Sequence, residues 1–73
     1  MIIEEGYLRG SIDGFNNQNT MFTFIGGGTW IQSEYKYVYQ YQYQPYAKVI
    51  EIKGQPYIQI DGIDDCVLVR KVK

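Results

Sequence analysis

Tyrosine occupies every second position in part of the segment EYKYVYQYQYQPY, residues 34–46, at Tyr35, Tyr37, Tyr39, Tyr41 and Tyr43. Side chains two residues apart share one face of a β-strand, whereas a helix brings together residues three or four apart. Tyrosine is also favoured in strands. We therefore expect one long strand over 29–44 with a tyrosine face and, in so small a protein, a bulge that shifts its register. Pro45 should end this strand, because proline cannot donate a ladder hydrogen bond.

The same period of two continues through the other apolar segments, and none of them has the helical period. Three glycines at 26–28 allow the chain to reverse, and the short connection at Gly54–Gln55 implies antiparallel neighbours. We predict a single all-β domain over residues 1–73, either a small SH3-like barrel or a strongly curved antiparallel sheet of five to six strands. The expected strand segments are 6–15, 20–25, 29–44, 46–54, 55–62 and 66–72.

The alternation also predicts which side chains form the core. The apolar residues expected to point inward are Leu8, Ile12, Phe22, Phe24, Ile50, Ile52, Ile58, Ile60, Val67 and Val69. They go far towards filling a barrel of this size. We therefore expect only one or two tyrosines, at the Tyr35 end, to cap the core, and the others to lie at the surface.

Composition argues against several classes of function. Seven basic and eight acidic residues give a net charge of −1, and the basic residues are scattered, unlike the patches that bind duplex nucleic acid. The chain has no histidine, the commonest general base and metal ligand, and its one cysteine, Cys66, has no histidine to activate it. We expect a non-enzymatic, cytoplasmic protein with no cofactor, no metal site and no membrane association. The acidic segment at 61–65 is expected to be a polar hairpin turn, because it lacks the spacing of a calcium loop.

A row of exposed aromatic rings usually marks contact with another molecule. The rings could instead lie flat on neighbouring strands through cross-strand pairs, or form a platform for stacking bases or sugars. Our leading prediction is an interaction module that contacts protein, either a partner or a second copy of the chain. The alternative is single-stranded nucleic-acid binding by aromatic stacking on the same rings. The predicted binding residues are Tyr37, Tyr39, Tyr41, Tyr43 and Lys36, the last being the only basic residue in the segment.

The segment from the glycine turn onward resembles a group of short bacterial proteins and C-terminal domains of unassigned function. The shared features are a hairpin turn, a tryptophan, a glutamine two residues later, alternating aromatics, a proline and a Val/Ile-rich strand. Here these are Gly28, Trp30, Gln32, Tyr35 to Tyr43, Pro45, and Val49 to Ile52. This chain has Gly-Gly-Gly where that group has Asn-Gly at the turn. The resemblance implies an SH3-like barrel, but it carries no activity, ligand or catalytic residue.

Overall fold

The computed structural model describes all 73 residues, and every regular element is a strand. The strands are β1 (Ile2–Tyr7), β2 (Ser11–Phe15), β3 (Met21–Thr23), β4 (Thr29–Gln32), β5 (Val38–Tyr43), β6 (Tyr46–Ile52), β7 (Gln55–Ile60) and β8 (Cys66–Lys71). The all-β prediction is confirmed. The chain has no helix long and apolar enough to cross a membrane.

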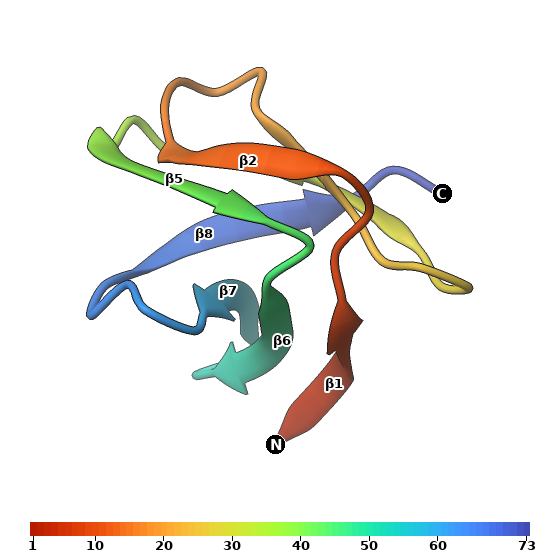
Figure 1. Cartoon of the computed structure of the whole chain (residues 1–73). Coiled ribbons are helices and arrows are strands. Elements are labelled where there is room, and N and C mark those ends of the chain that lie inside the picture. Colours follow the sequence, from red (N-terminus) through yellow and green to blue (C-terminus); the bar gives the residue numbers. More distant parts are fainter.

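Six strands form one antiparallel sheet in the order β1-β6-β7-β8-β4-β3 (Figure 1). The two ends of this sheet meet, because Leu8 directly after β1 forms a bridge with Phe24 directly after β3. Beside this bridge the Arg9 backbone N–H donates to the Thr23 carbonyl at 2.7 Å. The sheet is therefore curled into a small barrel.

The strands β2 and β5 form a separate two-stranded sheet, which lies above β8 in Figure 1. It continues the β1–β6 ladder beyond a bend, where Leu8 N donates to Pro45 O at 2.9 Å and Gln44 N to Gly10 O at 2.8 Å. Gln44 reaches the bend through a positive φ of 48°. Pro45 separates β5 from β6, as predicted.

The prediction of one continuous strand over 29–44 is wrong. The chain leaves the ladder after Gln32 and enters the second sheet at Val38, so that Tyr35 and Tyr37 lie in the connecting segment 33–37. The break is needed because β4 pairs with β3 and β8, whereas β5 pairs with β2. The predicted register shift is present, in the β2–β5 pairing between Ile12 and Gly14.

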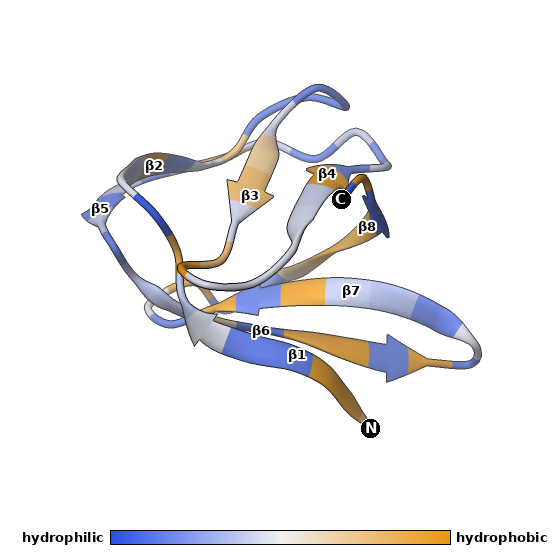
Figure 2. Cartoon of the chain, turned by 90° about the vertical axis from the view of Figure 1, so that its right-hand side faces the viewer, coloured by the Kyte–Doolittle hydropathy of each residue, from blue (hydrophilic) through white to orange (hydrophobic).

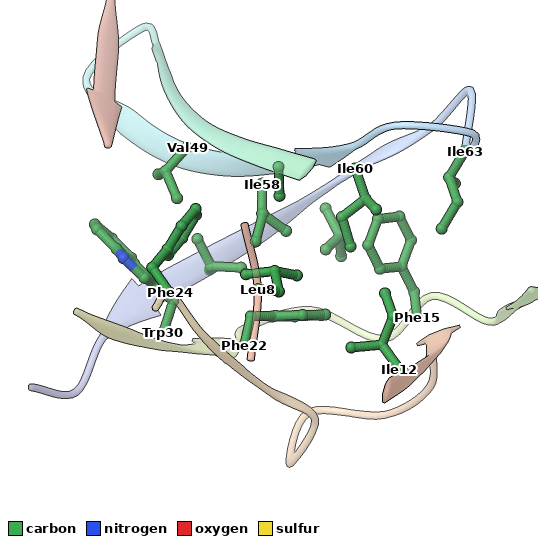
Figure 3. Close-up of a cluster of buried hydrophobic side chains, with 13 residues drawn as sticks. Leu8, Ile12, Phe15, Phe22, Phe24, Trp30, Val49, Ile58, Ile60 and Ile63 are labelled. Carbon is green, nitrogen blue, oxygen red and sulfur yellow. The ribbon is translucent and has the colours of Figure 1, made fainter. Parts of the chain in front are cut away.

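Thirteen apolar side chains form the core. They come from β2, β3, β4, β6, β7, β8 and the connecting segments, and Leu8 lies in the middle of the cluster (Figure 3). Eight of the ten predicted inward residues belong to it. The prediction was wrong for Ile50, which is half-buried, and for Ile52, which is 41% exposed. Adjacent Val49 and Ile50 leave the alternation ambiguous, and β6 resolves it by pairing Val49 with the buried Ile58.

The core also contains aromatic residues that the alternation did not select. Phe15 on β2 packs edge-to-face on Phe22 with 6.1 Å between ring centroids, and Trp30 on β4 is buried. With these rings inside, no tyrosine is needed to close the barrel. The expectation that Tyr35 caps the core is wrong, since Tyr35 is 76% exposed. Figure 2 shows the resulting contrast between the apolar segments of β3 and β8 and the polar to neutral β5.

Candidate functional site

Three tyrosines project from β5 into solvent, and we call them the β5 tyrosine row. Tyr39, Tyr41 and Tyr43 are 65%, 59% and 69% exposed. Across the sheet, Tyr43 pairs with Ser11 and Tyr39 with Gly14, and neither partner is large enough to cover a ring. The aromatic ring pairs of the protein, Tyr7–Tyr46 and Phe15–Phe22, do not involve the row. The rings are therefore not packed on large cross-strand neighbours.

Gly14 brings β2 unusually close to the strand that carries the row. Its φ is +102°, and a Cβ atom built there would lie 2.0 Å from the Val38 carbonyl oxygen. Only glycine tolerates both the backbone conformation and the approach.

The second edge of β5 has no neighbouring strand, because β5 pairs with β2 alone. No charged residue lies between Lys36 and Lys48. Edge strands are usually guarded against pairing with another chain by charge, proline or a bulge. In β5 the only such guards are the bulge in the β2–β5 pairing and Pro45 beyond its end.

The opposite face of β5 carries the amides. Gln40 and Gln42 are half-buried, and both amide nitrogens approach Gly62 in the β7–β8 connection. The Nε2 atom of Gln42 is buried without a hydrogen-bond partner. The Tyr/Gln alternation therefore places the tyrosine rings on the solvent face of β5 and the glutamine amides on its inner face.

The other two predicted binding residues lie in segment 33–37. Tyr37 is exposed but lies outside β5. The ammonium group of Lys36 donates to the Cys66 carbonyl at 2.9 Å and lies 3.9 Å from Asp65 Oδ1. Its ammonium group is therefore bound at the start of β8 and is not part of the β5 tyrosine row.

A second candidate surface, which the sequence did not single out, is an open pocket of about 460 Å³ between two loops. We call it the Asn/Tyr pocket. In Figure 1 both loops leave the left-hand end of the β2–β5 sheet. The lining residues are Asn16, Asn17, Asn19, Thr20, Tyr35 and Tyr37, all uncharged. The one signal for it in the sequence is the run NNQN at 16–19, whose residues are typical of a polar loop.

One fully buried side chain, Gln32, holds both walls of this pocket. Its Oε1 accepts from the backbone N–H of Asn16 at 3.2 Å. Its Nε2 donates to the carbonyls of Glu34 at 2.9 Å and Lys36 at 3.0 Å. A buried amide at the end of β4 therefore fixes the two loops relative to each other.

The shifted ionisable groups lie elsewhere, on β1 and β6. Burial of Glu4 opposes its ionisation, but hydrogen bonds from Gly28 N–H and Trp30 Nε1–H, with the charge of Lys71, bring its pKa below the usual value. The hydrogen bond to Glu5, together with burial, raises the pKa of Tyr46. No group of three or more metal-binding side chains occurs. Both shifted groups therefore belong to hydrogen bonds that join parts of the barrel wall, Glu4 to Gly28 and Trp30, and Tyr46 to Glu5.

Comparison with known proteins adds no assignment: the sequence matches no protein-family model, and neither a curated protein nor a solved structure matches it.

Proposed function

We propose that this protein is a non-enzymatic interaction module that binds a second copy of itself through the β5 tyrosine row. The observation that carries the proposal is the row of three uncovered rings on a strand with no charge and one unpaired edge. Tyrosine is enriched in protein interfaces, because its ring buries a large area while its hydroxyl keeps a polar contact.

The sequence of β5 favours a second copy over an unrelated partner. Residues 39–43 read Tyr-Gln-Tyr-Gln-Tyr, which is the same in both directions. A twofold axis at Tyr41 would place Tyr39 against Tyr43 of the second copy, and Tyr41 against its own equivalent. Homodimer interfaces are self-complementary in this way, with the same patch on both subunits.

The size of the row predicts weak association. With rings of roughly 150–250 Å² that are about two-thirds exposed, three tyrosines per copy would bury on the order of 800 Å² in total. This is below the roughly 1,200–2,000 Å² of stable complexes. We therefore expect a reversible dimer with a dissociation constant in the micromolar to millimolar range.

The test is the solution mass measured by light scattering from about ten micromolar to about one millimolar protein. The mass of the wild type should rise towards that of a dimer, and Tyr41→Ser should remain monomeric. Tyr7→Ser is the matched control, because Tyr7 is 58% exposed on β1 and is not part of the row. A wild type that stays monomeric throughout would refute the proposal.

Single-stranded nucleic-acid binding on the same rings has weaker support. Such binders combine stacking with a positive groove. The one cation in the segment, Lys36, is already engaged with Asp65 and Cys66. Salt-dependent quenching of tyrosine fluorescence by an oligonucleotide would favour this alternative.

A further inference from the structure

The Asn/Tyr pocket has the chemistry of a site for an uncharged, hydroxyl-rich ligand. It offers two exposed tyrosine rings with their hydroxyls, three side-chain amides and the hydroxyl of Thr20, and no charged group lines it. An amide group donates and accepts hydrogen bonds, as a sugar hydroxyl does. The C–H face of a pyranose ring is apolar and packs on an aromatic ring.

The same composition argues against other ligand classes. A phosphate or a nucleotide requires cationic groups or a cluster of backbone donors, and the nearby Lys36 is engaged outside the pocket. Sites for hard cations usually include several carboxylates, and none lines the pocket. A purely apolar ligand would leave the amides unpaired.

Some polar groups of the pocket bond to each other within the loop, and the others are free to bind a ligand. Within the Asn-rich loop, Asn17 Oδ1 accepts from Asn19 N–H at 2.8 Å, and Thr20 Oγ1 accepts from Asn17 N–H at 3.2 Å. The side-chain amides of Asn16 and Asn19 and the hydroxyls of Tyr35 and Tyr37 form no hydrogen bond within the chain. A ligand can therefore bind them without breaking an existing contact.

The pocket is also built before a ligand arrives. Gln32 connects the backbone of Asn16, on one wall, to the carbonyls of Glu34 and Lys36, on the other. The Gln32 N–H also donates to the Thr20 carbonyl at 2.7 Å. Preorganisation of this kind lowers the entropy that binding would cost. The volume of about 460 Å³ is within the range of roughly 300–1,000 Å³ seen for small-molecule sites.

We infer that the Asn/Tyr pocket binds an uncharged saccharide, with its pyranose rings stacked on both Tyr35 and Tyr37 and its hydroxyls bound by the asparagine side-chain amides. β-Linked glucose units suit such a site, because all ring hydroxyls are equatorial and both ring faces expose C–H groups. This inference is independent of the proposed dimer, since Tyr39, Tyr41 and Tyr43 do not line the pocket.

The experiment is an NMR titration of the ¹⁵N-labelled protein with cellotetraose, and separately with an N-acetylglucosamine trimer. Saturable shifts should appear in the backbone and side-chain amide signals of residues 16–20, with a dissociation constant of about 1 mM or tighter for at least one saccharide. Tyr37→Ala should weaken that binding at least tenfold. Tyr7→Ala is the matched control and should leave it unchanged, because Tyr7 is exposed but lies in neither the pocket nor the β5 tyrosine row.

Each other outcome overturns the inference. Failure of both saccharides to shift these signals at about 20 mM, far above the expected constant, would do so. So would equal affinity of wild type and Tyr37→Ala, or shifts caused by oligo(dT) and by neither saccharide. If Tyr37→Ala loses its dispersed spectrum, Tyr35→Ala provides the same test at a side chain that is 76% exposed. A monomeric wild type that still binds saccharide would refute the dimer and support the pocket.

Discussion

Replacement of Gln32 by methionine isolates the contribution of one buried amide. Methionine is close to glutamine in length and flexibility, so the change removes hydrogen bonds and leaves little cavity. Three backbone groups lose their partner: the N–H of Asn16 and the carbonyls of Glu34 and Lys36. All three hydrogen bonds are partly buried, so water can replace only part of what is lost.

The magnitude follows from the number of bonds. A net contribution of about 1 kcal/mol for each hydrogen bond gives a loss of about 3 kcal/mol, of which the more apolar side chain returns about 1 kcal/mol. We therefore expect Gln32→Met to lower the free energy of unfolding by about 2 kcal/mol. For a domain of 60–100 residues this corresponds to a fall in Tm of about 8–16 °C.

Gln42→Met provides the control within the same chain. The Gln42 amide nitrogen is buried without a partner, so its removal should leave the free energy of unfolding unchanged or raise it by about 0.5–1 kcal/mol. Urea denaturation followed by tryptophan fluorescence measures both variants. The reasoning fails if Gln32→Met costs less than about 0.5 kcal/mol, or if the two variants are destabilised equally.

Three further substitutions test other parts of the fold. Gly14→Ala should destabilise by more than about 2 kcal/mol in urea denaturation, because its Cβ would clash with the Val38 carbonyl; a smaller cost would mean that β2 and β5 can separate freely. Lys53→Asn should raise Tm by a few degrees, since asparagine tolerates the φ of 51° in this turn better than lysine; a lower Tm would contradict this. The pKa of Glu4 is lower in the folded state than in the unfolded chain. The stability that ionised Glu4 contributes is therefore fully present above about pH 4.5, and it is lost as the pH falls through the folded-state pKa. Glu4→Gln should therefore lower stability at pH 7, with a difference from wild type that shrinks at pH 3 in acid titrations of Tm; a difference independent of pH would refute the assignment.

The fold class was predictable from the sequence because period-two alternation is a local property. Glycine and proline marked several strand ends correctly, including the bend at Pro45, but the expectation of one strand over 6–15 is wrong, because β1 ends at Tyr7 and β2 begins at Ser11. The break between Gln32 and Val38 was not predictable, since the alternation of exposed tyrosines continues through it. Segment 33–37 stays outside the strands, so only the pairing partners, which lie far along the chain, reveal the interruption. The face of β6 was ambiguous for a related reason, because Val49 and Ile50 are adjacent and equally apolar.

The candidate sites were predictable only in part. Exposure of Tyr39, Tyr41 and Tyr43 follows from their shared face. The Asn/Tyr pocket depends on the approach of residues 16–20 to residues 35–37, a contact that no local pattern encodes. Gln32 carried a weak signal, since a glutamine at an inward position of a strand requires buried partners. Identification of those partners needed the three-dimensional arrangement.

The interruption of the long segment assigns the tyrosines to two different surfaces. Tyr39, Tyr41 and Tyr43 share one rigid strand, so their rings have a fixed spacing and suit a flat, repetitive contact such as a second β5 strand. Tyr35 and Tyr37 follow the turn held by Gln32 and line a concave polar surface with the asparagines, which suits a small ligand. The two surfaces are separate because β4 pairs with β3 and β8, whereas β5 pairs with β2. The change of pairing partner therefore divides one aromatic repeat into two sites of different shape, and the buried amide of Gln32 fixes the turn between them.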